Sequence, residues 1–405
     1  PCGARSAMAA PMTDHPLIRL NPGADRRIKA GHPWAFSNEI AMTVAARATP
    51  PGSVVRLEGD DGWRHGAWHF NPHSLIAARR LDHDPAAPAD VGWFRARLAA
   101  CLALRERLFD APHYRLVHAE ADGLPGLVVD RYGDAVAVQA NTAGMDRAMP
   151  DILAALRDLL APRVVVARND SGVRKLEGLP ESVTLLHGED GRAEVEEAGV
   201  TYPVDLLGGQ KTGWFFDQRP NRALVARLSA GRSVLDAFCH LGGFGLAAAR
   251  AGARRVTLLD RSDHALDLAM AAATRAGVAD RVTPVKAEAM EELERIAASG
   301  HRFEVVVADP PAFAKTRKDI PAATRGYAKL ARLAARVTAP GGVMFIASCS
   351  HHVGLADFAG AVAWGVARAR REARILATVG AGPDHPVHPA LPESAYLKGQ
   401  LLALD

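Results

Sequence analysis

The stretch SVLDAFCHLGGFG, residues 233–245, joins an apolar run to a glycine turn, and the alanine-rich segment 246–251 follows directly. An apolar strand that runs through such a turn into a helix is typical of an open α/β sheet, which binds ligands at the carboxyl edge of its strands. The glycine spacing differs from the Gly-x-Gly-x-x-Gly of a dinucleotide fold. The stretch therefore predicts a ligand-binding α/β domain that is not a dinucleotide-binding domain.

Outward from this turn, short apolar runs alternate with segments of helical spacing as far as the C-terminus. This rhythm predicts a parallel sheet with helices on both faces. We expect its strands at 233–238, 255–260, 282–286, 304–309 and 343–348, and an antiparallel edge pair at 373–379 and 396–402.

Polar residues stand where these strands end. Asp236 stands on the first strand, and Asp260, 24 residues later, ends the next strand, where a carboxylate can hold ribose hydroxyls. A tight turn and a helix-capping acid explain the glycines and Asp260 nearly as often. Asp309-Pro310-Pro311 follows the fourth strand, and two prolines stiffen the chain there, with a loop-breaking turn as the alternative. Cys349 follows the fifth strand beside two histidines, a setting that fits a nucleophile better than a core cysteine.

The segment GQKTGWFFDQR, residues 209–219, precedes the sheet and combines amide, cationic and aromatic side chains. Such a density of functional groups suggests a lid over a cofactor or a cradle for an anionic substrate. An ordinary amphipathic connection is the alternative.

The remaining chain predicts two further domains. We divide the sequence into a tail at 1–16, a β-rich domain at 17–85, a middle domain at 92–204 and the sheet domain at 205–405. Turn signals between short β-favouring runs predict a small β-barrel or sandwich in the first domain. The middle domain is predicted as α+β, with a helix at 145–160 and a last strand at 193–204.

Composition limits the class of protein. The chain has 405 residues and a net charge of +4, and it holds no apolar run long enough to span a membrane and no secretory signal. Its four cysteines lie far apart, so we expect no disulfide framework and a cytoplasmic protein. The histidines show no metal-ligand spacing, and a pI near 9.0 weakly favours a polyanionic partner.

Motifs along nearly the whole chain, from about Leu17 to Asp405, occur in the order of one known family: GHPWAFSNEI (31–40), EADGLPGL (120–127), residues 209–219, Asp309–Lys315, Arg325–Tyr327 and Ser348–His352. They resemble the S-adenosylmethionine-dependent methyltransferases with an N-terminal PUA domain, whose characterised members methylate cytosine C5 in large-subunit ribosomal RNA. The resemblance implies a PUA β-barrel, a middle α+β domain and a Rossmann-like methyltransferase domain with a seven-stranded, mostly parallel sheet. It also implies S-adenosylmethionine as cofactor and ribosomal RNA as partner.

The resemblance further implies roles for individual residues. The cofactor-binding positions are Asp236, Phe238, Gly242, Asp260, Arg261, Ala287, Glu288 and Asp309, with Phe215, Asp217 and Arg219 from the segment over the pocket. Cys349 resembles the family's thiol and Asp309 the residue between cofactor and base, so both are expected to be catalytic. The positions expected on the RNA side are Lys211, Phe313 and Tyr327 beside the pocket, and Arg26, Arg27 and Lys29 in the barrel. A solvated face explains the last three about as well as phosphate contacts do.

A cysteine nucleophile has a chemical reason in this setting. A Cys349 thiolate would add to C6 of cytosine and make C5 able to take the methyl group, while Asp309 would hydrogen-bond the ring N3 or the amino edge. Cys239 is the rival thiol, less well placed because it lies in the turn under the cofactor. His351 and His352 are candidates for the base that removes the C5 proton, or they cap the strand end.

Other interpretations stay open. Methyl transfer to an exocyclic nitrogen would need Asp309-Pro310-Pro311 alone, with Cys349 as a bystander. A nicotinamide-dependent dehydrogenase would use Asp260 but lacks the expected glycine spacing, and a non-catalytic RNA-binding scaffold would not need a complete pocket. The sequence decides neither the target nucleotide nor between a monomer and a homodimer.

Overall fold

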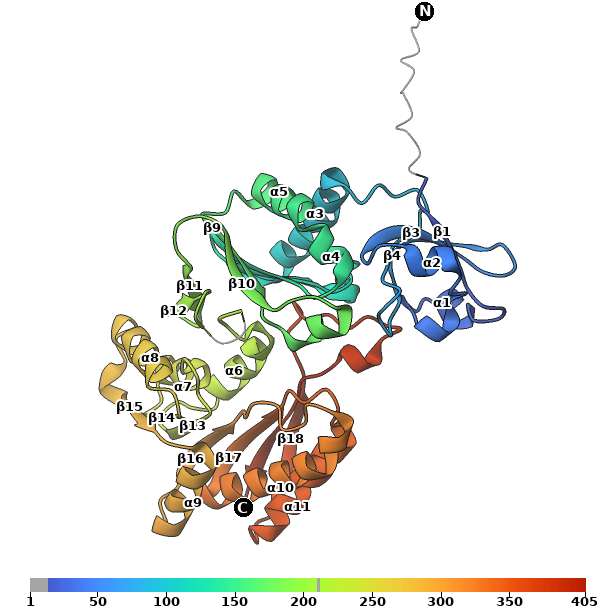
Figure 1. Cartoon of the computed structure of the whole chain (residues 1–405). Helices are drawn as coiled ribbons and strands as arrows, with labels where there is room; N and C mark the ends of the chain where they lie inside the picture. Colours follow the sequence, from blue (N-terminus) through green and yellow to red (C-terminus); the bar gives the residue numbers. More distant parts are fainter. Residues whose placement is uncertain (1–13, 210–211) are drawn as a thin grey trace, which may run out of the picture. The chain divides into compact units, whose positions relative to one another are not determined.

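A computed structural model describes residues 14–209 and 212–405, and Figure 1 shows the chain. The described residues form two compact units. The first holds the residues up to Gly191, with Asp205–Gly213 and His388–Leu391, and the second holds Arg192–Val204, Trp214–Val387 and Pro392–Asp405. One passage between the units falls at 204/205, the boundary expected from the sequence, but there the chain returns to the first unit, and it changes unit again at 213/214, 387/388 and 391/392.

The first unit begins with a sheet in the order β1-β3-β4-β5-β2. Its elements are β1 (Leu17–Arg19), α1 (Arg26–Lys29), β2 (Trp34–Ala35), α2 (Val44–Ala48), β3 (Ser53–Glu58), β4 (Arg64–Phe70) and β5 (Ala78–Asp82). Strands β1 and β3 are parallel and the other neighbours antiparallel. Trp68 and Phe70 are fully buried in the core of this domain. The prediction of a small β domain is confirmed.

A second sheet of the first unit has the order β10-β9-β8-β7-β6. Its elements are α3 (Val91–Leu108), β6 (His113–His118), β7 (Leu127–Tyr132), β8 (Ala135–Ala140), α4 (Ala143–Arg147), α5 (Met149–Leu160), β9 (Val164–Asn169) and β10 (Ser182–His187). The single helix expected at 145–160 is wrong, because Pro150 stands in the first turn of α5. Proline has no N–H to donate inside a helix but is well suited to a helix start.

A small hairpin of β11 (Arg192–Glu197) and β12 (Val200–Asp205) follows. The single strand expected at 193–204 is wrong because Ala198 and Gly199 both have positive φ, 53° and 73°. Two left-handed residues between antiparallel strands make the tight turn that suits a twisted hairpin.

The second unit is built on a sheet in the order β15-β14-β13-β16-β17-β19-β18. The strands are β13 (Ser233–Ala237), β14 (Arg255–Asp260), β15 (Val282–Lys286), β16 (Phe303–Ala308), β17 (Thr338–Ser348), β18 (Ala373–Val379) and β19 (Lys398–Leu404). The first five are parallel, and β19 pairs antiparallel with both β17 and β18. The sheet is therefore mixed, with the antiparallel edge pair that the sequence predicts. Its order reverses between β13 and β16, where open α/β sheets form a ligand-binding crevice.

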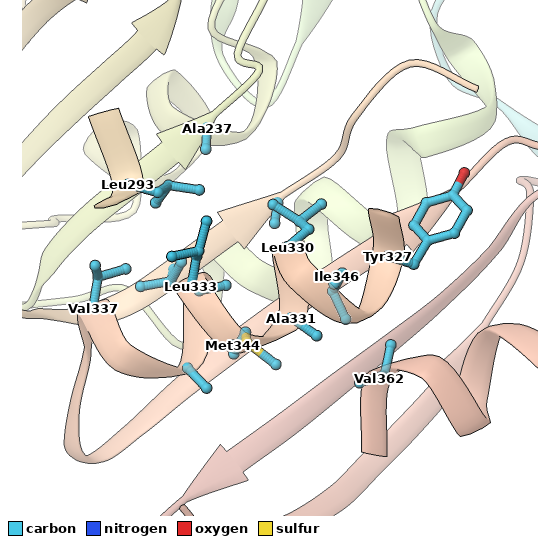
Figure 2. Packing of buried hydrophobic residues seen from close by; sticks show 14 of the residues in the cluster. Ala237, Leu293, Tyr327, Leu330, Ala331, Leu333, Val337, Met344, Ile346 and Val362 are labelled. Carbon is cyan, nitrogen blue, oxygen red and sulfur yellow. The ribbon is translucent and has the colours of Figure 1, made fainter. Parts of the chain in front are cut away.

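Helices join these strands: α6 (Arg219–Ala226), α7 (Gly243–Arg250), α8 (Asp263–Arg275), α9 (Ala289–Ser299), α10 (Ile320–Val337) and α11 (Leu355–Arg368). The buried residues of α10 recur every three or four positions, which gives the helix one apolar face. Figure 2 shows part of the resulting core, in which this face meets the sheet at Tyr327, Leu330, Leu333, Val337, Met344 and Ile346.

The contact between α10 and α11 depends on Gly365. A Cβ on Gly365 would lie 2.7 Å from the Cβ of Ala331 and closer still to the carbonyl oxygen of Ala328. Gly360, on the same helix, has open space around it. The two glycines therefore differ in packing although both lie in α11.

We expect Gly365→Ala to destabilise the protein by about 1–3 kcal/mol, because the added methyl group forces the helices apart. Gly360→Ala is the matched control, and it should stabilise the protein by about 0.5–1 kcal/mol, the usual gain in a helix. Urea denaturation of both variants measures the difference. Equal stabilisation by both would contradict the close packing at Gly365.

Candidate active site

Four neighbouring strands bring the predicted polar residues to one edge of the sheet. Asp236 lies near the end of β13, Asp260 ends β14, Asp309 follows β16 and Cys349 follows β17. Parallel strands share their carboxyl edge, so one topology places all four together. The edge combines three carboxyl groups with one thiol.

Asp236 is buried and holds the glycine turn. Its Oδ2 accepts a hydrogen bond from the backbone N–H of Gly245 at 2.8 Å. Burial, and then the charges of Asp309 and Asp260, raise the pKa of Asp236 to about 7. The carboxyl group therefore changes its charge near neutral pH.

Asp260 organises the loop between β13 and α7. Its Oδ2 accepts from the N–H of His240 at 2.9 Å, and its Oδ1 accepts from the N–H of Ser262 at 3.0 Å. Phe238 and His240 both have positive φ, 64° and 50°, which is unfavourable for residues with side chains. Such strain is concentrated at functional sites, and each Asp260 oxygen keeps lone pairs for another donor.

Two glycines of the turn have different structural causes. Gly242 has a φ of 75° and stands at the start of α7, where a side chain would be strained. Gly245 lies against β14, since a Cβ there would come within 2.9 Å of Cγ1 of Val256. Packing of α7 on the sheet thus explains part of the motif.

The positions expected around the adenine lie at the next strand end. The N–H of Ala287 donates to the carbonyl oxygen of Asp260 at 3.1 Å, and its side chain is half-buried. Glu288 is exposed at the start of α9, and Arg261 is exposed after β14. Ala287 therefore contacts Asp260 through its backbone, and Arg261 and Glu288 adjoin these two residues in the chain.

The later part of the segment expected over the pocket, residues 214–219, belongs to the second unit. Phe215 packs edge to face on His240, with ring centroids 5.4 Å apart. Asp217 accepts a hydrogen bond from the hydroxyl of Tyr396 through Oδ2, while its buried Oδ1 has no partner among the described residues. Arg219 lies 3.4 Å from Glu197. Lys211 lies outside the described residues.

Gln218 is a site residue to which the sequence assigned no role. Its Nε2 donates to Oδ2 of Asp309 at 2.9 Å, and its Oε1 accepts from Asn221 at 2.6 Å. Gln218 therefore fixes the orientation of the Asp309 carboxylate. The amide-rich segment pointed to a site residue, but the pairing with Asp309 joins residues 91 positions apart and leaves no pattern in the sequence.

A buried ion pair braces this segment. Arg222 is buried and donates to Oε2 of Glu197 at 2.7 Å, and its guanidinium lies 4.7 Å from the ring centroid of Trp214. Burial alone would raise the pKa of Glu197, but the Arg222 charge and hydrogen bond lower it overall. The hairpin of β11 and β12 is thereby fixed to α6.

The loop after β16 is joined to the loop after β17 through Tyr327. The Tyr327 ring is fully buried and stacks on Phe313 at 4.6 Å. Its hydroxyl lies 2.8 Å from Oγ of both Ser348 and Ser350, and the N–H of Ala314 donates to Ser350 at 3.2 Å. Tyr327 was expected on the RNA side, but the structure buries it in the core. From there its hydroxyl holds the two serines that flank Cys349.

The two candidate thiols differ in their surroundings. Cys349 is partly exposed between the buried Ser348 and Ser350. Cys239 is buried, and burial, followed by the charges of Asp236 and Asp260, raises the pKa of its thiol well above the usual value. A thiolate is therefore disfavoured at Cys239. Cys101 is buried as a core residue in α3.

The cations expected to meet RNA in the first domain carry intramolecular pairs. Arg27 donates to both oxygens of Glu39 at 2.8 Å, and Lys29 bonds Asp25 at 2.7 Å and Asp61 at 2.8 Å. Arg26 is exposed. Within residues 14–209 and 212–405, no group of His, Cys, Asp and Glu could hold a metal ion, and no helix is long and apolar enough to cross a membrane.

Comparison with known proteins identifies the family. A model of S-adenosylmethionine-dependent methyltransferases matches residues 159–402. The chain belongs to this family. Its cofactor is S-adenosylmethionine, and a model of the PUA-like domain matches residues 18–83.

Relatives of this methyltransferase match along almost the whole chain. Ribosomal RNA large subunit methyltransferase I of Shewanella frigidimarina is 36% identical over 393 residues, which cover 94% of this chain and 98% of that protein. The protein of the same name from Aeromonas hydrophila is 37% identical over 392 residues, with the same shares covered. A crystal structure of a protein assigned as a methyltransferase, complexed with SAH, covers 96% of this chain and all of that one with a TM-score of 0.81. At 19% identity this likeness shows the fold.

We expect Asp236→Asn to change how the stability of the methyltransferase depends on pH. The carboxyl group has a pKa near 3.8 when unfolded and about 7 when folded, so the folded state binds the extra proton between these values. Stability of the wild type should fall as pH rises through this window, by at most about 1.4 kcal/mol per pH unit, and this loss should be absent from the variant. Urea titrations from about pH 5 to about pH 8 measure it. Asp267→Asn, on the exposed face of α8, is the control, and parallel curves for wild type and Asp236→Asn would refute the expectation.

Proposed function

We propose that this chain methylates C5 of a cytosine in large-subunit ribosomal RNA through a covalent adduct with Cys349. The names of the relatives that match along the chain support the substrate, and the PUA-like domain agrees with an RNA partner. The observation that carries the chemistry is the position of Cys349, partly exposed at the sheet edge that holds Asp309. Cys239, buried and with a raised pKa, is a poor alternative.

The residues at the sheet edge suit the cofactor. When bound, S-adenosylmethionine supplies a methyl group on a positively charged sulfur and presents hydroxyl and ammonium donors. The site offers acceptors to match these donors, namely the oxygens of Asp260 and the unpartnered Oδ1 of Asp217. The residues proposed to hold it are Asp236, Phe238, Gly242, Asp260, Arg261, Ala287, Glu288, Asp309, Phe215, Asp217 and Arg219.

The chain's own groups then perform the reaction on the base. The Cys349 sulfur forms a bond to C6, which makes C5 nucleophilic. Asp309, oriented by Gln218, hydrogen-bonds the ring N3 or the amino edge. After methyl transfer a base removes the C5 proton, the bond between sulfur and C6 breaks, and the thiolate is restored.

Two histidines are the proposed bases for this last step. His351 and His352 are exposed and follow Cys349 within three positions. The ring of His351 stacks on Tyr396 with centroids 4.9 Å apart, which restricts its orientation. A restrained imidazole near the thiol suits proton removal at neutral pH.

RNA contacts are proposed for Lys211, for Phe313 beside the site and for Arg26 in the PUA-like domain. Arg27 and Lys29 stay proposed contacts, but their ion pairs mean that a phosphate competes with Glu39, Asp25 and Asp61. Their contribution should therefore be smaller than that of unpaired cations.

We expect Cys349→Ala to lower the yield of labelled 5-methylcytidine by about 10³-fold or more, because the variant has no nucleophile. The measurement is nucleoside mass spectrometry of large-subunit ribosomal RNA, as naked RNA and as particles, after incubation with isotopically labelled S-adenosylmethionine. Cys239→Ala is the matched thiol control and should keep most of the activity. Retained turnover in Cys349→Ala, or a label on an exocyclic nitrogen, would reject the covalent route and favour direct transfer beside Asp309-Pro310-Pro311.

A further inference from the structure

A group of exposed cations follows the Asp309 loop. Lys315, Arg317 and Lys318 lie on the loop before α10, and Arg325 lies on the first turns of that helix. We call these four residues the basic surface. The only acid between residues 315 and 325 is Asp319.

Asp319 orders this loop without pairing with the cations. Its Oδ2 accepts from the N–H of Lys315 at 3.1 Å, and from the N–H and the hydroxyl of Thr316 at 2.8 and 3.0 Å. Among the described residues, none of the four cations of the basic surface has an ion pair. Farther along α10 the situation differs, because Lys329 and Arg332 both lie within 4.0 Å of Glu294.

The basic surface adjoins the site. Ala314, the residue before Lys315, donates its N–H to Ser350, which follows Cys349. The protonated form of His352, on the same loop as Cys349, helps to lower the pKa of Asp319, after the stronger effect of its hydrogen bonds with Thr316. Unpaired, exposed cations on an ordered loop are suited to phosphate groups.

We propose that the basic surface binds phosphates of the RNA strand next to the nucleotide that is methylated. This rests on the proposed function, since it takes RNA as the substrate. The surface would hold the strand while the base enters the pocket, a task that the ion-paired cations of the PUA-like domain are less suited to perform.

The test compares two double variants that remove equal charge. Arg317→Gln with Lys318→Gln should weaken binding of a fluorescent single-stranded RNA and reduce the slope of log Kd against log salt by about 0.7 for each phosphate that is no longer neutralised. Lys329→Gln with Arg332→Gln, which removes the ion-paired cations, should change the slope much less. Unchanged affinity for S-adenosylhomocysteine shows that both variants are folded.

The outcomes separate the two proposals. Equal slopes for both variants, with RNA methylation by the wild type intact, overturn the basic surface alone. Normal RNA binding that depends on the basic surface, without any RNA methylation, overturns the proposed function alone. A wild type that binds no RNA overturns both.

A second observation concerns Lys398, at the start of β19. The side chain is buried, and its Nζ donates to the carbonyl oxygens of Ser350 at 2.7 Å and Val353 at 2.6 Å. The backbone of Lys398 pairs with Ser348. Lys398 therefore contacts the chain on both sides of Cys349.

Electrostatics agree with this placement. Burial lowers the pKa of Lys398 overall, and the negative charge of a Cys349 thiolate acts in the opposite direction. The other titratable groups described at this loop are the Tyr327 hydroxyl from α10, the two histidines of the loop itself, Tyr396, which stacks on His351, and Asp319, which interacts with His352. A protonated Lys398 brings an ammonium charge to the loop that carries Cys349, and a nearby positive charge favours a thiolate.

We infer that Lys398 is a positioning residue for Cys349, which fixes the loop at 350–353 and favours the thiolate. This rests on the proposed role of Cys349, but its test does not require methyl transfer. Two variants separate charge from hydrogen bonding: Lys398→Arg keeps the charge, and Lys398→Gln keeps a donor without charge.

The readout is the pH dependence of alkylation of Cys349 by iodoacetamide, followed by mass spectrometry of the Cys349 peptide. Lys398→Gln should raise the pH midpoint by about one unit, so that alkylation at neutral pH is about tenfold slower, and Lys398→Arg should stay near the wild type. A loosened loop alone would speed alkylation without moving the midpoint, and that result overturns the inference. A shifted midpoint together with full turnover in Cys349→Ala would overturn only the proposed function.

Discussion

The hydroxyl group of Tyr327 connects the two loops on which the proposed chemistry depends. It bonds Ser348 and Ser350 on either side of Cys349, and it lies 3.5 Å from the N–H of Phe313 in the Asp309 loop. The ring is fixed because α10 packs on the sheet through a continuous apolar core (Figure 2). A hydrogen-bonded phenol in a close-packed interior allows little movement, so the packing of α10 sets the relative positions of Asp309 and Cys349.

Local patterns in the sequence predicted the elements that have a strong local signal. Strands β14, β15 and β18 begin and end as expected, because each is a short apolar or β-branched run with clear turn signals. The errors occur where a single residue overrides the pattern. Pro150 starts a new helix, and Ala198 takes a left-handed conformation that its side chain does not favour. Strand β17 begins at Thr338, five residues before the prediction, because Thr338 pairs with Phe303 across the sheet.

The residues of the site also divide into those that local sequence patterns could place and those that they could not. Asp236, Asp260, Asp309 and Cys349 could be placed together from the sequence, because parallel strands share one edge and each residue stands at a strand end. Gln218, Lys398 and the buried position of Tyr327 could not. Each depends on a contact between residues far apart in the chain. The type of a polar residue does not reveal which distant residue it will bond. The ion pairs of Arg27 and Lys29 were missed for the same reason.

The path of the chain between the two compact units determines whether the methyltransferase domain can be separated from the residues before it and still fold stably. A fragment beginning at residue 205 would contain every strand of the seven-stranded sheet, yet it would lack Glu197, which comes from the hairpin before it. Arg222 would then be a buried cation without its partner, a situation that typically costs about 3–5 kcal/mol. The hairpin is therefore part of the catalytic unit in energetic terms. Recombination between related enzymes at residue 205 would separate Glu197 from Arg222. A hybrid that received only the seven-stranded sheet and its helices would therefore lack an ion pair that the domain needs for stability.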